Sequence, residues 1–408
     1  MQLQDIKNIY HLFQAYWACL RYNFPSKKLK VIGITGTDGK TTTTSLIYHI
    51  LKSAGKKVSM VSTVTAQIGS KSYDTGFHVT TPSAHDVQRY LHEALLDGNE
   101  YFVFETTSHG LDQYRVGGVQ YEIGVITNIT HEHLHYHRTY EKYVQAKARL
   151  IQMSKIGILN KDDDSYQHLQ KYITPKNEIY TYGLEKPADY TVDIEKELGI
   201  SLVPFNRYNY LAAYVVCKKL GLLDDEIFPA MKNYVLPPGR MDVVYDKEIK
   251  VIVDFAHTPN AIRHALQAVH AMYGKKLKRI IHIFGAAAFR DDEKRPIMGR
   301  ESGAYADTVI LTEEDYRTED PYKISAEIAA GLEEKGFTFV APEKYSGAAK
   351  TYTTIVSRQE AIEKAIGLAQ NDDVIIMTGK GHEKSLCRGK VEYPWDDAKA
   401  ALQAIKQA

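Results

Sequence analysis

Cysteine is scarce in this sequence, and no long apolar run is present. Cys19, Cys217 and Cys387 are the only three cysteines, and they are too far apart for a C-x-x-C pair. This excludes a disulfide framework and a cysteine zinc site, and it is typical of a reducing compartment such as the cytoplasm. The most apolar stretch, residues 9–20, is too short to span a bilayer. We expect a helix docked on the first domain, with a membrane-surface helix as the alternative.

An excess of charge of either sign is also missing. The formal net charge is +1, while 25% of the residues are charged and 44% are hydrophobic. This composition is that of a globular protein, and it argues against a nucleic-acid partner bound through bulk positive charge. A chain of 408 residues is expected to form two or three domains. Recognition of ligands must therefore depend on local motifs.

The clearest motif is in residues 31–44, where an apolar strand precedes a glycine-rich turn and a helix. Gly36 and Gly39 allow backbone N–H groups to face an anion, Lys40 supplies a positive charge, and Thr41 offers a hydroxyl to Mg²⁺. The turn matches a short Gly-Lys-Thr form and not the full phosphate-loop pattern. An ordinary glycine turn is the alternative, but the helical apolar spacing that follows disfavours it. The sequence predicts a site for ATP or GTP.

Apolar runs alternate with helical patterns along the whole chain, which predicts an α/β fold. We expect a P-loop-type, mainly parallel central domain followed by a second, Rossmann-like α/β domain. The less regular alternation of residues 189–204 suggests an antiparallel edge, and Pro237-Pro238-Gly239 suggests a boundary. The predicted parts are an N-terminal extension at 1–29, a central domain at 30–237 and a C-terminal domain at 238–408.

Candidate metal ligands follow the third apolar run of the central domain. Glu105 ends residues 101–105, in the position from which P-loop folds hold Mg²⁺ opposite the lysine and threonine. Downstream, four histidines alternate, and these are His131, His133, His135 and His137. Phosphate chemistry uses Mg²⁺ with oxygen ligands, so we expect at most one histidine on the catalytic ion. The others are expected to face solvent or substrate.

Polar side chains also follow the predicted strands of the C-terminal half. Strand ends are where α/β proteins form their sites. The residues are Arg240, Asp254, His257, Arg290, Arg295, Glu314, Arg317, Lys380, His382 and Glu383. Each one taken alone is interpreted as a solvated loop charge. Together they predict an anionic or zwitterionic substrate.

Five motifs now stand in order along the chain. They are Gly36-Thr-Asp-Gly-Lys-Thr-Thr42, Glu105-Thr-Thr-Ser-His-Gly-Leu-Asp-Gln-Tyr-Arg115, Pro238-Gly-Arg-Met241, Asp254-Phe-Ala-His-Thr-Pro259 and Gly379-Lys-Gly-His-Glu383. In this order they resemble the Mur ligases, specifically the MurE type, from about residue 30 to the C-terminus. Those enzymes add the third amino acid to UDP-N-acetylmuramoyl-L-Ala-D-Glu in cell-wall peptidoglycan synthesis. The resemblance implies an ATP-dependent acid–amino-acid ligase that works through an acyl phosphate.

The resemblance also implies roles for individual residues. The ATP site would comprise Gly36, Thr37, Asp38, Gly39, Lys40, Thr41 and Thr42, with Arg240, Asp254 and His257 from the second domain. Two Mg²⁺ ions would be held by Thr41, Glu105, His133 and Lys147, and the catalytic residues would be Lys40, Glu105, His133 and Lys147. Lys147 falls where Mur ligases carry a carbamylated lysine, and only the added carbon dioxide makes that side chain an oxygen ligand.

Substrate contacts are implied in the same way. The acceptor, a peptide or nucleotide-sugar-peptide, would be bound by Thr80, Thr81, Thr107, Gln113 and Arg115. The incoming amino acid, with a diamino acid as one candidate, would be bound by Arg290, Arg317, Gly379 and Glu383. Guanidinium groups suit a carboxylate, and the glutamate suits an ammonium group. The Asp-Asn-Pro-Arg motif of diaminopimelate-adding enzymes reads Glu314-Asp-Tyr-Arg317 here.

The N-terminal region departs from the MurE pattern. About thirty residues precede the phosphate-loop strand, too few for a separate uridine-binding domain. The acceptor then lacks UDP, or a partner or the N-terminal helix supplies that binding. A folylpolyglutamate synthase-like ligase is the nearest enzymatic alternative. A catalytically idle Mur-ligase-fold binding protein is another, and the full set of charge-neutralising residues disfavours it.

Overall fold

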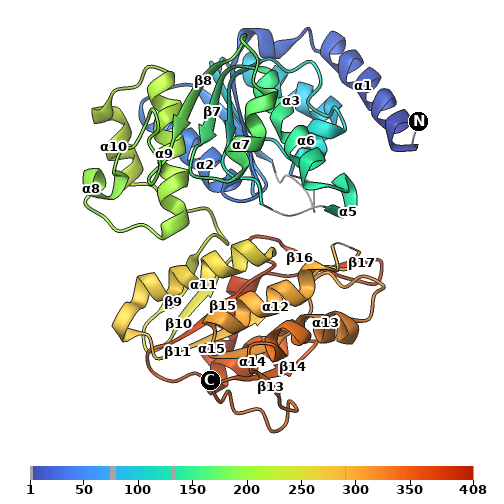
Figure 1. The fold of residues 1–408 in the computed structure, drawn as a ribbon, viewed down its shortest axis with the longest axis vertical. Coiled ribbons are helices and arrows are strands. Elements are labelled where there is room, and N and C mark those ends of the chain that lie inside the picture. The colour runs from blue at the N-terminus through green and yellow to red at the C-terminus, as the bar shows by residue number, and fades with distance from the viewer. Residues whose placement is uncertain (1–2, 74–79, 131–133, 290, 408) are drawn as a thin grey trace. The chain divides into compact units, whose positions relative to one another are not determined.

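The computed structural model describes residues 3–73, 80–130, 134–289 and 291–407, and the chain forms two compact units (Figure 1). The first unit is Met1–Val235 and the second is Leu236–Ala408. Within the described ranges, none of the helices has the length and apolar character needed to cross a bilayer.

An eight-stranded sheet forms the centre of the first unit, in the order β4-β3-β2-β5-β1-β6-β7-β8. The pairings β2–β3 and β3–β4 are antiparallel, and every other pairing is parallel. The strands are β1 (Lys30–Thr35), β2 (Val58–Val61), β3 (Ala66–Ile68), β4 (Lys71–Tyr73), β5 (Tyr101–Glu105), β6 (Tyr121–Ile126), β7 (Ser154–Asn160) and β8 (Glu178–Tyr182). Parallel neighbours need crossover connections, which the helices provide.

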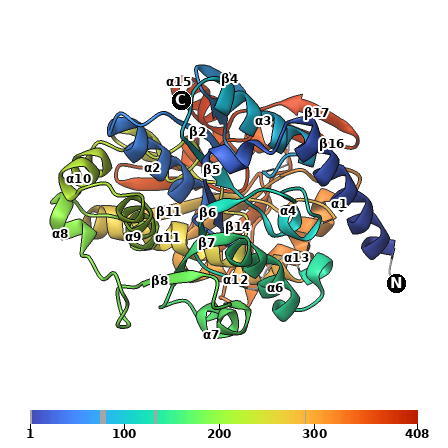
Figure 2. The ribbon, with the colours of Figure 1, turned by 90° about the horizontal axis from the view of Figure 1, so that it is seen from above.

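Helices cover both faces of this sheet (Figure 2). They are α1 (Leu3–Arg21), α2 (Lys40–Ser53), α3 (Ala84–Leu96), α4 (Ser108–Asp112), α5 (Leu134–His137), α6 (Tyr140–Gln152), α7 (Ser165–Leu169), α8 (Ile194–Leu198), α9 (Pro204–Lys219) and α10 (Asp224–Lys232). Figure 2 shows α2 and α9 on one side of the strands and α3 and α4 on the other. Burial of both sheet faces explains why the strands read as continuous apolar runs.

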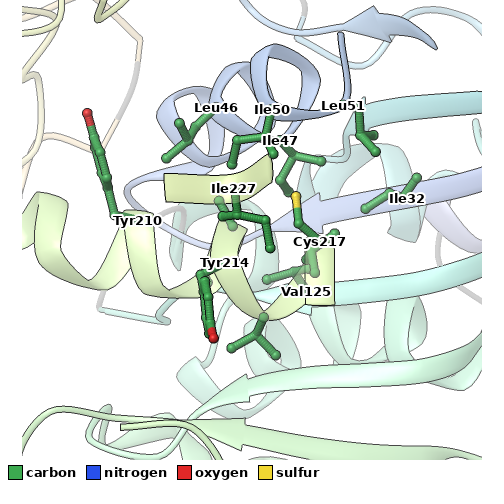
Figure 3. Packing of buried hydrophobic residues seen from close by; sticks show 14 of the residues in the cluster. Ile32, Leu46, Ile47, Ile50, Leu51, Val125, Tyr210, Tyr214, Cys217 and Ile227 are labelled. Atoms are coloured by element: carbon green, nitrogen blue, oxygen red, sulfur yellow. The ribbon is translucent and has the colours of Figure 1, made fainter. Parts of the chain in front are cut away.

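The core between α2 and the sheet fixes the helix that carries the phosphate loop. Leu46 and Ile50 of α2 are fully buried, as are Cys217 of α9 and Ile227 of α10 (Figure 3). Val125 of β6 is buried in the same cluster and contributes to it from the sheet. Each large buried aliphatic side chain contributes about 1.5–3 kcal/mol through removal from water. The packing holds the N-terminus of α2 at the end of β1.

Helix α1 docks on the first unit through its small side chains. Ala15 and Ala18 are buried, and Cys19 Sγ donates to the Gly117 carbonyl oxygen at 3.5 Å. A β-carbon on Gly118 would lie only 2.5 Å from Cys19 Sγ, so the glycine permits the close approach. Several larger apolar side chains of the helix stay exposed, and these are Tyr10, Phe13, Tyr16, Trp17 and Leu20.

The expected antiparallel edge at residues 189–204 is wrong. Ile194–Leu198 forms helix α8, and before it Tyr190 makes an isolated parallel bridge to Tyr182 of β8. The last strand of the sheet is β8, which pairs in parallel with β7. The helix starts because the Asp193 side chain accepts the Lys196 backbone N–H, and Ile194 and Leu198 are buried at the helical spacing of four. The antiparallel edge of the sheet is instead the short pair β3 and β4.

The second unit contains a seven-stranded sheet in the order β13-β14-β12-β11-β15-β10-β9, parallel except for the β9–β10 pair. The strands are β9 (Asp242–Asp246), β10 (Lys250–Val253), β11 (Arg279–Phe284), β12 (Thr308–Leu311), β13 (Thr338–Phe339), β14 (Thr351–Thr354) and β15 (Asp373–Met377). A hairpin of β16 (Ser385–Arg388) and β17 (Val391–Pro394) follows them. The helices are α11 (Pro259–Tyr273), α12 (Lys294–Tyr305), α13 (Pro321–Glu333), α14 (Arg358–Leu368) and α15 (Asp397–Gln407).

Both sheets are mainly parallel and helix-covered, so the α/β prediction is confirmed for each unit. The carboxyl ends of the parallel strands are therefore where site residues should gather.

Candidate functional site

The phosphate loop joins β1 to α2 and is held from both sides. Asp38 donates its backbone N–H to Asn128 Oδ1 at 2.9 Å, and its carbonyl oxygen accepts from Thr127 Oγ1 at 2.7 Å. Lys40 Nζ donates to the Thr37 carbonyl oxygen at 2.9 Å. These bonds fix the loop ahead of a 14-residue helix, whose N-terminal N–H groups attract anions. The geometry suits a bound phosphate group.

Two glycines make this loop possible. A β-carbon on Gly36 would lie 1.8 Å from Thr127 Oγ1, and one on Gly39 would lie 2.2 Å from Asn209 Oδ1. Gly39 also has a φ of 82°, in the left-handed region that favours glycine. Asn209 belongs to α9 and was not predicted from the sequence. The sequence offered one signal, a pair of asparagines within an otherwise apolar helical run. In the structure these two side chains are bonded to each other, with Asn209 Nδ2 donating to Asn206 Oδ1 at 3.0 Å.

Glu105 is the best-supported candidate metal ligand. Its side chain is almost fully buried, and its two carboxylate oxygens accept from Thr41 Oγ1 at 3.1 and 3.2 Å. Thr63 donates twice more, from its backbone N–H at 2.9 Å and from its hydroxyl at 2.8 Å. A carboxylate and a hydroxyl are the oxygen donors that Mg²⁺ prefers. Thr41 and Glu105 therefore fit a Mg²⁺ ion.

A metal site made only of protein groups is not found in the described part of the chain, where no three His, Cys, Asp or Glu side chains cluster suitably. Mg²⁺ is usually bound by one or two carboxylates together with phosphate oxygens and water, so this finding agrees with the Thr41–Glu105 pair. His133 lies outside the described residues, and its role stays a prediction. His137 is buried and lies 3.1 Å from Ser108 Oγ, so a solvent-facing position is wrong for it.

Lys147 of α6 is buried behind the phosphate loop. Its Nζ donates to the Gly36 carbonyl oxygen at 2.5 Å and lies 4.6 Å from the centre of the Tyr143 ring. Tyr143 OH is in turn 3.2 Å from Thr37 Oγ1. A lysine that is only 1% exposed is unusual, because burial of a charged ammonium group is costly. Thr42 is buried as well, in the first turn of α2.

The predicted acceptor residues come together at the ends of β5 and α4. Thr107 donates its backbone N–H to Thr81 Oγ1 at 2.9 Å, and the two hydroxyl oxygens are 3.0 Å apart. Arg115 donates to the Thr81 carbonyl oxygen at 3.0 Å and to Gln113 Oε1 at 2.6 Å. Thr80 Oγ1 lies 3.1 Å from Thr63 Oγ1. All five predicted residues therefore form one polar strip.

In the second unit, the predicted ATP-side residues lie at the end of β10. Asp254 accepts the backbone N–H of Met241 at 2.7 Å and that of Ala256 at 2.8 Å, so it holds two turns together. The Arg240 guanidinium lies 4.5 Å from the centre of the Phe255 ring. His257 Nδ1 is 2.9 Å from the Phe255 carbonyl oxygen. The geometry makes Asp254 a structural anchor, and its proposed contact with ATP stays a prediction.

The predicted amino-acid residues of this unit border a charged cluster. Lys380 Nζ lies 2.9 Å from Asp315 Oδ1 and 2.5 Å from Glu383 Oε2. A β-carbon on Gly379, whose φ is 104°, would lie 2.8 Å from Glu314 Oε2. That oxygen is buried and has no hydrogen-bond partner among the described residues. Burial raises the pKa of Glu314 to about 7, against the opposing attraction of Lys380.

Two further arginines belong to this prediction. Arg317 is partly buried beside the cluster, with its backbone N–H donating to the Cys387 carbonyl oxygen at 3.1 Å. Arg290 lies outside the described residues.

Arg295, expected to face the substrate, is instead 1% exposed and paired with Glu319 at 2.8 Å and Glu327 at 2.6 Å. The substrate-facing interpretation of Arg295 is wrong, because its charge is satisfied within the fold.

A phosphate loop, an oxygen-donor metal pair and an adjacent hydroxyl strip are the features of a nucleotide-dependent phosphoryl-transfer enzyme. Family models agree with this class. Residues 34–217 match the Mur ligase middle domain, and residues 239–381 match the Mur ligase, glutamate ligase domain.

Curated relatives match over most of the chain. A UDP-N-acetylmuramoyl-L-alanyl-D-glutamate–2,6-diaminopimelate ligase of Geobacillus thermodenitrificans is 35% identical over 95% of this chain and 81% of its own length. An enzyme of the same name from Aquifex aeolicus is 37% identical over 93% of this chain and 78% of its own. A solved structure of a ligase with this name has a TM-score of 0.58 at 28% identity, covering 93% of this chain and 78% of that one.

The chain therefore belongs to the Mur ligase family, ATP-dependent acid–amino-acid ligases of peptidoglycan precursor synthesis that use Mg²⁺. A MurF ligase of Thermotoga maritima solved with ADP shares the fold, with a TM-score of 0.64 at 15% identity, over 98% of this chain and 83% of that chain.

Proposed function

We propose that this ligase joins the amino group of an amino acid to the carboxylate of a muramoyl-dipeptide-like acceptor in the cytoplasm. The names of the curated relatives support this choice of acceptor. The observation that carries it is the closeness of the two halves of the site within the first unit. Thr81 Oγ1 lies 3.4 Å from the backbone carbonyl oxygen of Glu105, so the acceptor strip adjoins the residue that carries the metal-side carboxylate.

The reaction has two balanced steps. An acceptor carboxylate oxygen attacks the γ-phosphorus of ATP and ADP leaves, which gives an acyl phosphate. The neutral amine then attacks the acyl carbon, inorganic phosphate leaves, and the nitrogen loses a proton to give the amide. Lys40 is positioned to neutralise the transferring phosphoryl group, and Arg115 to hold the acceptor. Bound Mg²⁺ supplies further neutralisation of phosphate charge.

The second unit supports a diamino acid as the incoming substrate. Glu314 and Glu383 offer carboxylates that suit an ammonium group, and Arg317 offers a guanidinium that suits a distal carboxylate. The diaminopimelate named in the curated relatives has both groups. The glutamates of this unit thus select an amino acid with a second amino group.

Lys147 is proposed to carry a carbamate. Carbon dioxide adds to the neutral ε-amine with release of a proton, and the product is an oxygen anion able to bind a second Mg²⁺ with His133. Burial of Lys147 beside Tyr143 supports the idea, because an anion matched to a metal removes an otherwise costly buried ammonium.

Phosphate release with a panel of acceptors and amino acids tests the proposal. We expect turnover with UDP-muramoyl-dipeptide, or with the same peptide lacking UDP, together with a diamino acid. The two acceptor forms also show whether uridine recognition needs a partner protein. Turnover only with folate and glutamate would identify a folylpolyglutamate synthase-like ligase. An absence of ATP binding and turnover would favour an idle binding protein.

A further inference from the structure

The loop after β2 contains a threonine that touches both halves of the candidate site. Thr63 donates to Glu105 through its backbone N–H at 2.9 Å and through its hydroxyl at 2.8 Å. The same hydroxyl oxygen lies 3.1 Å from Thr80 Oγ1. Glu105 is the candidate metal ligand, and Thr80 is a predicted acceptor contact. Thr63 therefore connects the metal side to the acceptor side through one side chain.

The chemistry of the hydroxyl fixes the direction of these bonds. Thr63 has one hydroxyl proton, and an ionised carboxylate can only accept a hydrogen bond. The Thr63 hydroxyl is the donor toward both Glu105 Oε1 at 2.8 Å and Thr80 Oγ1 at 3.1 Å, so these two oxygens share its one proton. The shorter, charge-assisted bond to the carboxylate takes the larger part of that proton.

Thr41 completes the arrangement from the opposite side. Its hydroxyl donates to both carboxylate oxygens of Glu105, at 3.1 and 3.2 Å. The Glu105 side chain is only 1% exposed. Its orientation is therefore set by contacts such as these threonine hydrogen bonds and not by solvent. Groups that hydrogen-bond a metal ligand orient it, and their loss typically lowers metal affinity about 10–100-fold.

We propose that Thr63 is a positioning residue that couples occupancy of the acceptor site to binding of Mg²⁺ and nucleotide. It acts by orienting Glu105, and an acceptor that engages Thr80 in place of Thr63 leaves the Thr63 proton to Glu105 and so strengthens that orientation. The inference rests on the proposed function for the identity of the acceptor. Because coupling between two ligands is reciprocal, Mg²⁺–nucleotide should tighten acceptor binding by the same factor.

Calorimetry of Mg²⁺-dependent binding of a non-hydrolysable ATP analogue tests the orienting role. The variant Thr63→Val removes the hydroxyl at nearly constant volume, and Thr63→Ser keeps it. The matched control is Thr65→Val in the same loop, whose hydroxyl accepts from Gln67 Nε2 at 3.2 Å. We expect the Mg²⁺ concentration needed for half-maximal binding of the analogue to rise about 10–100-fold in Thr63→Val. In Thr63→Ser and Thr65→Val it should stay within about threefold of the wild-type value. Equal values in Thr63→Val and wild type would overturn the proposal.

A second titration, with saturating UDP-muramoyl-dipeptide, tests the coupling. The acceptor should tighten analogue binding in wild type and Thr63→Ser and leave it unchanged in Thr63→Val. Equal tightening in all three would overturn the coupling. A Thr63→Val protein that does not fold, as judged by its thermal transition, is replaced by Thr63→Ala in both titrations. Failure of the proposed function gives a different result, because wild type then binds Mg²⁺ and the analogue but turns over no acceptor.

Discussion

Asn209 Oδ1 lies so close to Gly39 that a β-carbon added to this glycine would be 2.2 Å from that oxygen. The two residues are far apart in sequence, one in the phosphate loop and one in α9. Thr43 Oγ1, in the first turn after the loop, also lies 3.5 Å from the same oxygen. Helix α9 thus sets the conformation of the phosphate loop from behind.

Gly39→Ala should therefore abolish nucleotide binding. The new β-carbon meets Asn209 and also strains a residue whose φ is 82°. Gly55→Ala is the matched control, because Gly55 has a φ of 71° but no atom within 4 Å of its β-carbon position. We expect Gly55→Ala to lose about 1 kcal/mol of unfolding free energy and keep ATP affinity. Equal ATP affinity in the two variants would contradict the contact with Asn209.

Glu105→Gln should lower the turnover number about 100- to 1000-fold, because a neutral amide cannot replace the anion beside Thr41. Glu122→Gln serves as control, since Glu122 pairs at the surface with Lys155. Excess Mg²⁺ should restore part of the lost rate. Steady-state kinetics across a Mg²⁺ series provide the measurement, and an unchanged Mg²⁺ dependence would remove Glu105 from the metal site.

Lys147→Ala should lose about 100- to 1000-fold in rate, and Lys142→Ala, on the exposed face of the same helix, should lose none. Enzyme freed of carbon dioxide should regain activity on addition of bicarbonate. Carbon-13 NMR with labelled bicarbonate should show one carbamate signal in the wild type and none in Lys147→Ala. A wild-type spectrum without that signal, together with full activity of Lys147→Ala, would refute the carbamate.

Glu314→Gln should stabilise the second unit above neutral pH. Burial raises the pKa of Glu314 from 4.5 to about 7 in the folded chain. Folding therefore favours the protonated form of Glu314. The contribution of this form to the free energy of unfolding is complete below pH 4.5 and is lost as the pH rises through about 7. Glutamine does not ionise, so the variant should gain on the order of 3 kcal/mol near pH 8 and nothing near pH 4.5.

Urea unfolding at both pH values measures this difference. Glu363→Gln is the control, because Glu363 is exposed on α14 and accepts from Gln359 Nε2 at 2.8 Å. A gain from Glu314→Gln that is the same at both pH values would show that ionisation of Glu314 is not its cause.

Local patterns were sufficient for much of the fold and part of the site. The loop at residues 36–42 and the carboxylate of Glu105 follow a recognisable order of strand, turn and strand end, so both were predicted. The α/β class followed from the alternation of apolar runs and helical spacing. These features depend on neighbours in the sequence.

The missed features depend on tertiary contacts. Thr63 carries no local signal and Asn209 only a weak one, and the importance of both comes from partners on other elements. Glu314 was predicted among the polar residues that follow strands, but its burial beside Gly379 was not. Arg295 was misassigned because its partners Glu319 and Glu327 are on a different segment. Helix α8 was missed because its five residues are too few for a clear period.

Transfer of oxygen-18 tests the central claim of an acyl-phosphate ligase most directly. The acceptor is labelled in its carboxylate and incubated with ATP, Mg²⁺ and a diamino acid, and the released phosphate is analysed by mass spectrometry. Formation of an acyl phosphate moves one carboxylate oxygen into each phosphate released, and the amide keeps the other. We predict one labelled oxygen per phosphate. Amide formation with unlabelled phosphate would contradict the account.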